Sequence, residues 1–277
     1  MEMEMISREE AINYLKNNFI AIHCNSIYGW QYGKSFFDAE MDYTCYKSNG
    51  CLIIKYISYL TQINGEYAIS NKPQKIKFNI HQISNESDVC AVWKYILENE
   101  KIENVKRTII IYAGDPLPEE TEIFLGFRKY VRKGEYYEDS CVRVMTKNDE
   151  TIIKELCEDS ITNDNYFGKR EAETFYSWFE HESTVELLGI FNGNKLAGLV
   201  SVNRYDDVNM AQVGDLLIHK DYRRLGFGRR LVKSALNLYT DREYYYQAAK
   251  QNDASKELAL SLGFKFAGAE LWALDEE

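Results

Sequence analysis

The stretch Asp221-Tyr222-Arg223-Arg224-Leu225-Gly226-Phe227-Gly228-Arg229-Arg230-Leu231 joins an apolar segment to an amphipathic one through two glycines set among basic residues. Gly226 and Gly228 permit backbone conformations closed to other residues and let a ligand approach the main chain. Successive amides of such a turn can point at one phosphate, and a helix that begins there adds its own dipole. The stretch therefore predicts an anion-binding turn between a strand and a helix.

The flanking segments support this order of elements. Residues 211–219 end in a short apolar run, which is typical of a buried strand. After the turn, apolar residues recur at spacings of three and four, which predicts a helix. The turn is not a Walker loop, which ends in Gly-Lys-Ser/Thr, nor a dinucleotide fingerprint, because Leu231 stands where the third glycine belongs.

The turn resembles the pyrophosphate loop of the GNAT superfamily of N-acetyltransferases, Arg/Gln-x-x-Gly-x-Gly/Ala, with Arg223, Gly226 and Gly228 at the three fixed places. The resemblance extends from Cys141 to Leu274. Residues 252–264, which run from Asn252 through Ala254-Ser255 to Leu262-Gly263-Phe264, are similar to the closing motif of the family. The elements expected around the turn are strands at 142–145, 186–191, 195–203 and 243–249, helices at 149–159 and 169–179, and a hairpin turn at Asn192-Gly193-Asn194.

The resemblance implies that acetyl-CoA is the cosubstrate and lies where the strand ending at Ile218 splays from the strand beginning near Tyr244. The pantetheine arm would pair with the backbone of Leu216 to Ile218, and the pyrophosphate would lie on the amides of Arg224 to Arg229. A backbone N–H near Ile218 would polarise the thioester carbonyl. The cofactor-binding residues that it implies are Leu216, Leu217, Ile218, Arg223, Arg224, Leu225, Gly226, Phe227, Gly228, Arg229, Asn252 and Ser255.

The catalytic residues depart from the family pattern. Many members place a tyrosine directly after the leucine of the closing motif, but here Ala259 follows Leu258. Tyr246 is the predicted substitute as general acid, and Asp215 is the predicted general base for an amine that attacks directly in a ternary complex. The alternatives are Tyr244, Tyr245 or water for the acid, and Glu186 or Asp206 for the base.

Features of the first half recur in the second half in the same order, which indicates a duplicated fold. Asn49-Gly50 matches Asn192-Gly193, Phe78-Asn79-Ile80-His81 matches Leu216-Leu217-Ile218-His219, and Leu125-Gly126-Phe127 matches Leu262-Gly263-Phe264. The apolar residues 108–112 are placed like the strand at 243–249. A helix is expected from Val89, with Val89, Val92, Trp93, Ile96 and Leu97 on its apolar face.

The first half lacks the residues of the turn. Its equivalent, Gln82 to Val89, has no glycine and carries Glu86 and Asp88, which would repel a pyrophosphate. The prediction is therefore an α/β (α+β) protein of two GNAT-like domains, each a mixed, mostly antiparallel twisted sheet flanked by helices. Residues 1–136 form a degenerate copy that supports or covers the active site, or serves only as a scaffold, and residues 137–277 form the acetyl-CoA-binding domain.

Composition limits the partners. The chain has 277 residues and a net charge of −10, which argues against nucleic acid and anionic membranes as partners and is compatible with an amine substrate. The acidic start is unlike a signal peptide and no apolar stretch is long enough to span a bilayer, so a cytoplasmic location is expected. The six cysteines show no C-x-x-C spacing and the four histidines no H-x-x-x-H pair, which predicts neither a disulfide framework nor a metal site. The oligomeric state stays open.

The predicted activity is transfer of an acetyl group from acetyl-CoA to the primary amine of a small molecule or amino-acid-like acceptor. Two alternatives remain. One is a CoA-binding sensor without turnover, which the alanine at position 259 and the degenerate first half favour. The other is a tandem-GNAT transferase that takes an aminoacyl group from charged tRNA, against which the acidic charge and the intact CoA turn count.

Overall fold

A computed structural model describes residues 1–17, 41–63, 66–103, 105–114, 122–136, 138–163, 185–205 and 209–274. The predicted helix at 169–179 and the alternative base Asp206 lie outside these residues. The chain forms two compact units, each described here by itself. Unit 1 comprises Met1–Gly126, Ala248–Gln251 and Phe266–Glu277, and unit 2 comprises Phe127–Gln247 and Asn252–Lys265.

Unit 1 is built on a mixed sheet with the strand order β1-β2-β3-β6-β7-β14, next to which β8 begins. Strands β2 and β3 form a hairpin through Asn49-Gly50, whose φ angles of 46° and 69° are the two positive values that a tight type I′ turn requires. A separate small hairpin pairs β4 with β5. The strands are β1 (Glu4–Ile6), β2 (Met41–Ser48), β3 (Cys51–Ser58), β4 (Leu60–Ile63), β5 (Glu66–Ile69), β6 (Lys75–Gln82), β7 (Lys106–Ala113), β8 (Glu122–Val131) and β14 (Lys265–Leu274).

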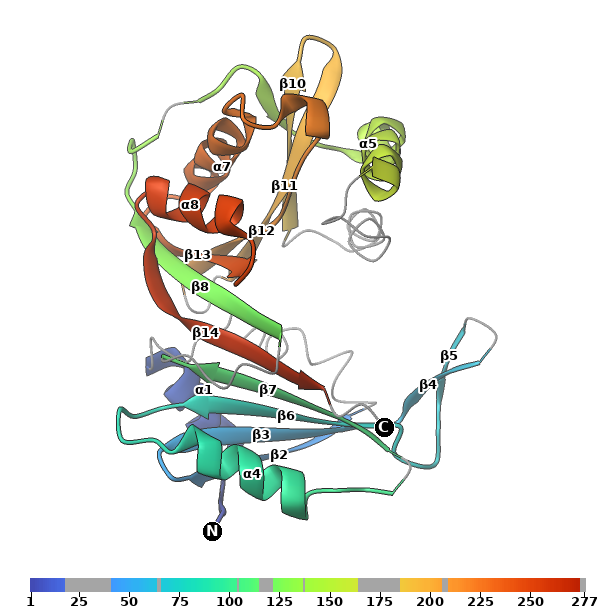
Figure 1. Ribbon diagram of the computed structural model, residues 1–277, viewed down its shortest axis with the longest axis vertical. Coiled ribbons are helices and arrows are strands. Elements are labelled where there is room, and N and C mark those ends of the chain that lie inside the picture. Colours follow the sequence, from blue (N-terminus) through green and yellow to red (C-terminus); the bar gives the residue numbers. More distant parts are fainter. Residues whose placement is uncertain are drawn as a thin grey trace. The chain divides into compact units, whose positions relative to one another are not determined.

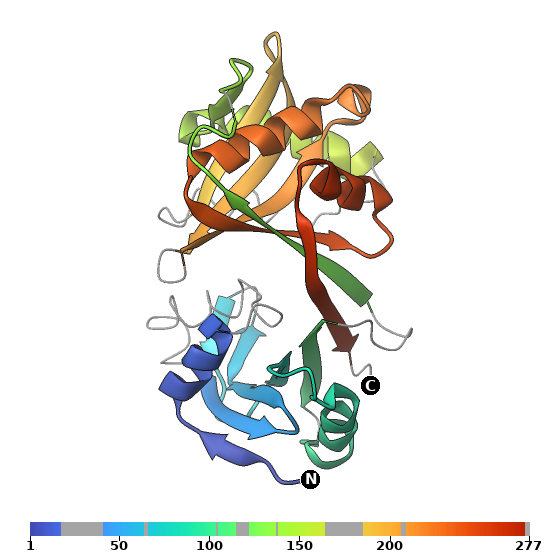
Figure 2. The same ribbon diagram turned by 90° about the vertical axis from the view of Figure 1, so that its left-hand side faces the viewer.

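Among the described residues of unit 1, helices α1 and α4 lie on opposite sides of its sheet (Figure 2). Helix α4 (Val89–Asn99) buries Val89, Val92 and Ile96, with Trp93 and Leu97 packed beside them, as its apolar periodicity predicts. Helix α1 (Arg8–Asn17) packs on the other side through Ala11, against a core cluster that includes residues of β3. Each face of the sheet thus has its own apolar core.

Unit 2 repeats this plan with the strand order β8-β13-β12-β11-β10-β9. The predicted hairpin at Asn192-Gly193-Asn194 is confirmed, because Asn192 pairs with Lys195 across the turn. Strands β12 and β13 run parallel, whereas β9, β10, β11 and β12 pair antiparallel in sequence. The strands are β9 (Val142–Val144), β10 (Val185–Asn192), β11 (Lys195–Tyr205), β12 (Met210–Ile218) and β13 (Arg242–Ala249).

Helices cover both faces of the unit 2 sheet, with α5 and α7 on opposite sides of β10 and β11 (Figure 1). Helix α7 (Phe227–Leu238) buries a stripe at the predicted spacing, which includes Leu231, Val232, Ala235 and Leu236. Helix α5 (Glu150–Asn163) packs through Ile153, Leu156 and Cys157 onto Leu187, Leu199 and Leu217. The other helical elements in the described part of unit 2 are η1 (Lys147–Asp149), η3 (Lys220–Tyr222) and α8 (Asp253–Ser261).

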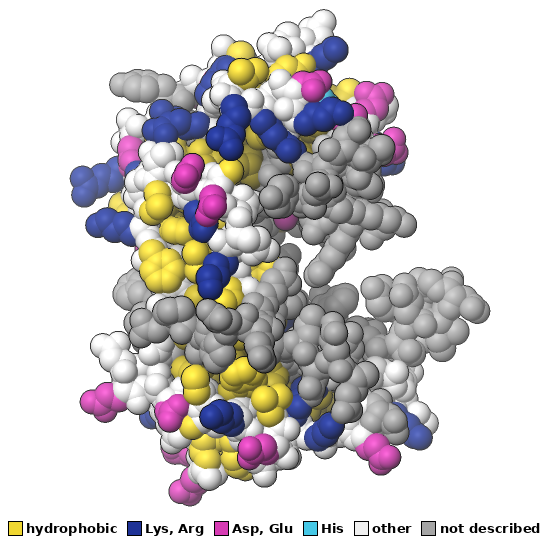
Figure 3. Space-filling model, viewed as in Figure 1, with side chains coloured by type: hydrophobic (Ala, Val, Ile, Leu, Met, Phe, Trp, Pro, Cys, Tyr) yellow, Lys and Arg dark blue, Asp and Glu magenta, His cyan; other side chains and the backbone are white. Residues whose placement is uncertain are grey.

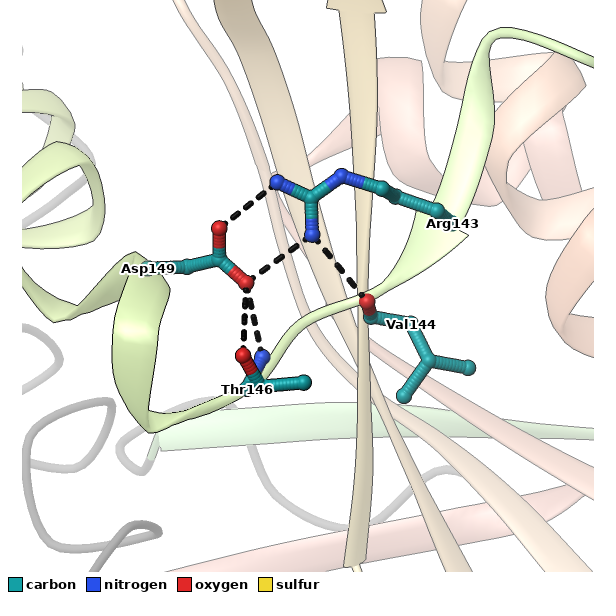
Figure 4. A network of polar contacts seen from close by, with 4 residues as sticks. All are labelled: Arg143, Val144, Thr146 and Asp149. Carbon is teal, nitrogen blue, oxygen red and sulfur yellow. Dashed lines mark hydrogen bonds and ion pairs between the residues drawn. The ribbon is translucent and has the colours of Figure 1, made fainter.

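A polar network fixes the start of α5 (Figure 4). The Asp149 carboxylate accepts two hydrogen bonds from Arg143, at 2.9 and 2.6 Å, and others from the backbone N–H and hydroxyl of Thr146. These donors, Arg143 first, hold the pKa of Asp149 well below its usual range. Strand β9, which carries Arg143, is thereby tied to the helix that follows it.

The architecture confirms the predicted fold class, a mixed and mostly antiparallel sheet flanked by helices. One feature of the two units has no signal in the sequence: the C-terminal strand β14 belongs to unit 1, where Ala269 to Leu274 pair antiparallel with β7. The end of β8, from Phe127, belongs instead to unit 2. Compact units are not the same as independent domains, so the division at 136/137 stays a prediction.

One proposed repeat is wrong. Leu262-Gly263-Phe264 ends helix α8, with Gly263 at a φ of 84°, whereas Leu125-Gly126-Phe127 lies inside strand β8. The tripeptides match because glycine and bulky apolar residues occur both at helix ends and in strands, so three letters do not define a conformation. The other matched elements, the Asn-Gly hairpins and the strands β6 and β12, hold equivalent places. In the described residues, no helix is long and apolar enough to cross a membrane.

Candidate active site

The candidate site begins at an irregularity in β12. The register between β11 and β12 shifts between Val200, which pairs with Leu216, and Val202, which pairs with Val213. Gly214 and Asp215 therefore face the single residue Ser201, which is a β-bulge. A side chain at Gly214 would clash, because its Cβ would lie 2.3 Å from the hydroxyl of the fully buried Ser201. A glycine inside a strand pattern was the available sequence signal for this bulge.

Beyond the bulge, β12 parts from β13. Their parallel pairing runs from Met210 and Glu243 to Val213 and Tyr246, where it ends, although β12 continues to Ile218 and β13 to Ala249. On its other edge, β12 stays paired with β11 up to Ile218. A bulge bends its strand and increases the local twist, which accounts for the separation. The predicted splay between these strands is therefore present.

The backbone of β12 faces the open edge at alternate residues. The N–H of His219 donates to the carbonyl of Ala197 on β11, so the backbone of Ile218 points the opposite way. The Ile218 carbonyl accepts a hydrogen bond from Nε of Arg223 at 2.9 Å, on that side. The Ile218 N–H lies at the same edge, the place that the prediction gives to the group that polarises a carbonyl.

The glycine turn leads from this edge into α7. Arg224 and Gly226 both have left-handed backbones, with φ angles of 62° and 82°, and Gly226 is the N-cap residue. Because Gly226 has no side chain, it cannot cap the first amides of the helix, which stay available to an anion. Among the described residues, no atom lies within 4 Å of a Cβ placed at Gly226, so there is open space beside the turn. These features fit a pyrophosphate.

The arginines around the turn divide into two groups. Arg230 binds the Asp139 carboxylate through two hydrogen bonds, at 2.7 and 2.8 Å, and Arg229 binds the hydroxyl and carbonyl of Ser261. The side chains of Arg229 and Arg230 therefore bind other protein groups and stabilise the fold of unit 2. Arg224 is exposed within the turn, in unit 2, where Lys and Arg side chains gather around α7 and α8 on the face seen in Figure 3.

The start of α8 brings three predicted residues together. Asn252 is the N-cap and accepts a hydrogen bond from the N–H of Ser255 at 3.1 Å. The Ser255 hydroxyl lies 2.8 Å from the phenol oxygen of Tyr246. Burial raises the pKa of Tyr246, so its phenol is protonated at neutral pH, as a proton donor must be. Its ring lies edge-on against Phe264.

The other candidate catalytic residues differ in their burial and hydrogen bonds. Tyr244 is fully buried, and its hydroxyl donates to the carbonyl of Ala235 and accepts from the N–H of Tyr239, so it holds α7 on the sheet. Tyr245 is buried as well, and Ala259 is fully buried where the family places its tyrosine. Asp215 is exposed in the bulge, and Glu186 is half-buried in β10.

The sequence interpretation missed His219, at the end of β12. Its Nε2 lies 2.9 Å from the Asp159 carboxylate on α5, and its Nδ1 accepts the N–H of Asp221 at 3.2 Å. A ring nitrogen that accepts carries no proton, so the neutral ring has its proton on Nε2, toward Asp159. The histidine thus links α5 to the short helix that precedes the glycine turn.

The equivalent region of unit 1 is built differently. The parallel pairing of β6 and β7 continues from Lys75 and Lys106 to His81 and Tyr112, and the β3–β6 register has no bulge. The N-cap of α4 is Asp88, whose carboxylate accepts the N–H of Ala91 at 2.9 Å. The described connection from β6 to α4 therefore has neither a splayed edge nor an uncapped helix start. Across the described residues, no three Cys, His, Asp or Glu side chains converge as metal ligands.

Comparison with known proteins begins with the fold. A Drosophila protein of 10% identity matches with a TM-score of 0.58 over 98% of both chains. A GCN5-related N-acetyltransferase from Sphaerobacter thermophilus matches with a TM-score of 0.54 and 8% identity, over 98% of this chain and 94% of its own. A tandem GNAT protein from the clavulanic acid biosynthesis pathway matches with a TM-score of 0.53 and 11% identity, over 100% and 99%. At these identities the likeness concerns the fold, which is the tandem GNAT fold.

A comparison of the sequence with family models finds one match. Residues 152–264, which hold the bulge, the glycine turn and α8, match the model of the acetyltransferase (GNAT) family. This match confirms the predicted resemblance to the GNAT superfamily over this part of the chain. A comparison with curated proteins gives no significant match.

Proposed function

We propose that unit 2 is an acyl-CoA-dependent N-acyltransferase, with acetyl-CoA as the donor and the primary amine of a small or amino-acid-like molecule as the acceptor. The observation that carries the proposal is the open edge of β12 beyond the bulge, continuous with the uncapped start of α7. A thioester cosubstrate with a pyrophosphate needs both features, a strand edge for its amide-bearing arm and free amides for its phosphates.

The chain's own residues divide the work. The amides from Arg224 to Arg229 would hold the pyrophosphate, and the edge from Leu216 to Ile218 the pantetheine arm. Bound acetyl-CoA would supply the acyl group as a thioester, from which the thiolate of CoA is a good leaving group. The Ile218 N–H would stabilise negative charge on the carbonyl oxygen, and Asp215 would remove a proton from the acceptor amine. Tyr246, through Ser255, would supply a proton on the α8 side.

The direct test is calorimetric titration of the full chain with acetyl-CoA and with CoA. One site per chain is expected, with micromolar affinity. Gly226→Val should weaken binding at least about tenfold by closing the turn. Gly193→Val is the matched control, because Gly193 also has a positive φ and open space around it but lies in a distant hairpin. No binding by the wild type, or equal binding by both variants, would overturn the cofactor site.

Measurement of turnover distinguishes an acyltransferase from a CoA-binding sensor. Release of free CoA thiol is measured with a panel of small amines and amino acids, and Tyr246→Phe should lower the rate while sparing CoA affinity. A CoA-binding sensor is the second candidate, favoured by the buried Ala259 at the tyrosine place. CoA binding without turnover on any amine would support the sensor. Binding of charged tRNA in place of CoA would support the aminoacyl-transferase reading.

A further inference from the structure

The ring of His219, directly after β12, is held on two sides by the protein. Its Nε2 lies 2.9 Å from the Asp159 carboxylate on α5, and its Nδ1 accepts the N–H of Asp221 at 3.2 Å. A neutral imidazole has one N–H to donate and one lone pair to accept with, and these contacts use both. His219 therefore has no nitrogen left to take a proton from an amine, and its role must be sought in the groups that it connects.

On one side, His219 holds the backbone that enters the glycine turn. It is the N-cap residue of η3, because its ring accepts the Asp221 N–H and its carbonyl accepts the N–H of Tyr222 at 2.9 Å. Capping by a side-chain acceptor fixes the first amides of a helical turn. Arg223, the first residue of the glycine-turn motif, follows η3 directly and donates to the Ile218 carbonyl.

Two aromatic rings lead from His219 to the start of α7. The ring of His219 is tilted against Tyr222, with 5.6 Å between centroids, and Tyr222 is tilted against Phe227 at 5.4 Å. Phe227 is the first residue of α7, directly after the N-cap Gly226. Packed side chains transmit a displacement from one element to the next. His219 is thus in contact, through these rings, with the helix start where the pyrophosphate is proposed to bind.

On the other side, His219 contacts the helix that covers the acceptor face of the sheet. Leu217 packs against α5, and alternate residues of a strand share a face. Asp215, the proposed base, therefore lies on the same side of β12 as α5 and the ring of His219, whereas α7 covers the opposite side (Figure 1). An amine that gives its proton to Asp215 would accordingly approach on the α5 side.

We propose that His219 is a positioning residue that couples the glycine turn to α5, so that CoA bound at the turn also fixes α5 on the acceptor side. The inference rests on the function proposed for unit 2, because it assigns regulation to that same site. Coupling between two sites is reciprocal, so an acceptor held against α5 would in turn raise the affinity for CoA.

The two contacts of His219 can be removed one at a time. In His219→Asn, the side-chain oxygen takes the place of Nδ1, which keeps the bond from the Asp221 N–H and loses the contact with Asp159. In His219→Gln, the longer side chain brings its amide N–H to Asp159 and loses the bond from Asp221. The first variant therefore releases α5, and the second releases the turn.

Backbone hydrogen exchange of the full chain, with and without saturating CoA, measures the coupling. In the wild type, CoA should slow exchange of the α5 amides around Asp159 about fivefold, the effect of one neutral hydrogen bond. In His219→Asn this protection should disappear, while calorimetry should show CoA affinity within about twofold of the wild type. In His219→Gln the affinity should fall about fivefold.

Glu155→Gln is the matched control, because Glu155 is an exposed carboxylate on α5 one turn before Asp159. It should keep both the CoA affinity and the protection of α5. Absence of α5 protection in the wild type, or equal protection in His219→Asn, would overturn the coupling. Wild-type CoA affinity in His219→Gln would overturn it as well.

Failure of the cofactor site gives a different result. No CoA binding by the wild type would overturn the proposed function of unit 2 and, with it, the coupling to CoA. Exchange in the CoA-free protein tests the local role of His219 separately. Amides from Asp221 to Gly228 should exchange faster in His219→Gln than in His219→Asn, and equal rates would show that His219 does not hold the turn. Unchanged protection of β10 and β11 would show that both variants are folded.

Discussion

Both units contain a strand–turn–helix connection at the same place in the fold, but its geometry differs between them. In unit 2, β12 bulges at Gly214, leaves β13, and passes through a glycine turn into a helix with free amides. In unit 1, β6 is straight, stays paired with β7, and enters a helix capped by Asp88. The N-cap residues lie 138 positions apart (226 − 88 = 138), and so do Gly214 and the fully buried Ile76 (214 − 76 = 138). Unit 2 therefore has glycines, Gly214 and Gly226, at the two places where unit 1 has Ile76 and Asp88. These two differences accompany the open edge of β12 and the closed edge of β6.

The largest effect should come from transferring the unit 1 cap into unit 2. Gly226→Asp places a carboxylate where the pyrophosphate is proposed to lie, and should lower acetyl-CoA affinity by at least about 100-fold through charge repulsion. Gly226→Asn is the matched control, because asparagine has the same size and tolerates a positive φ without the charge. Calorimetry compares the two, and equal affinities would mean that no phosphate group contacts the N-cap.

The bulge should be sensitive to a single methyl group. Gly214→Ala brings a Cβ within 2.3 Å of the Ser201 hydroxyl oxygen and should cost about 1–3 kcal/mol of unfolding free energy. Adding Ser201→Ala leaves the side-chain nitrogen of Asn203 at 3.5 Å and the Cβ of residue 201 at 3.7 Å, both ordinary contacts, and should restore most of the loss. Urea denaturation of both single variants and the double variant measures the coupling. Additive costs would show that the clash does not cause the requirement for glycine.

The capped starts of α5 and α1 should differ in their response to pH. Asp149 has a lowered folded pKa, so its stabilisation is complete above the unfolded value of about 4 and is lost as the pH falls toward the folded value. Asp149→Asn should therefore cost about 1 kcal/mol at pH 7, and the difference from the wild type should shrink in acid. Ser7→Ala removes the neutral hydroxyl that accepts the N–H of Glu10 in α1, and its cost should not vary with pH. A pH-independent cost for Asp149→Asn would exclude the ion pair as the source.

The smallest effect is expected for the reverse exchange in unit 1. Asp88→Gly uncaps α4, which should lower stability by a few tenths of a kcal/mol. Acetyl-CoA stoichiometry should stay at one per chain, because β6 and β7 remain paired along their length. Calorimetry of this variant beside the wild type gives the count. A second site in Asp88→Gly would mean that the cap alone, and not the straight strand, keeps unit 1 from binding.

The sequence predicted well where local chemistry decides the conformation. Arg223, Gly226 and Gly228 located the turn, and the apolar spacing after them located α7, because a helix face is read directly from its periodicity. Prediction failed for Leu125-Gly126-Phe127, which lies in a strand, since a short match carries no information on hydrogen-bond partners. The pairing of Tyr246 with Ser255 and the link from His219 to Asp159 were also out of reach, because each joins residues on different elements.

The sequence by itself determined the family features: the glycine turn, the strand and helix around it, the hairpins, and the acidic residues that replace the turn in the first half. These follow from residue types at short spacing, which fix backbone conformation and local charge. Only the tertiary structure decided that the β12 edge is open while the β6 edge is closed, and that β14 belongs to unit 1. Each depends on which strands exchange hydrogen bonds, and that choice is made by packing between residues far apart in the chain.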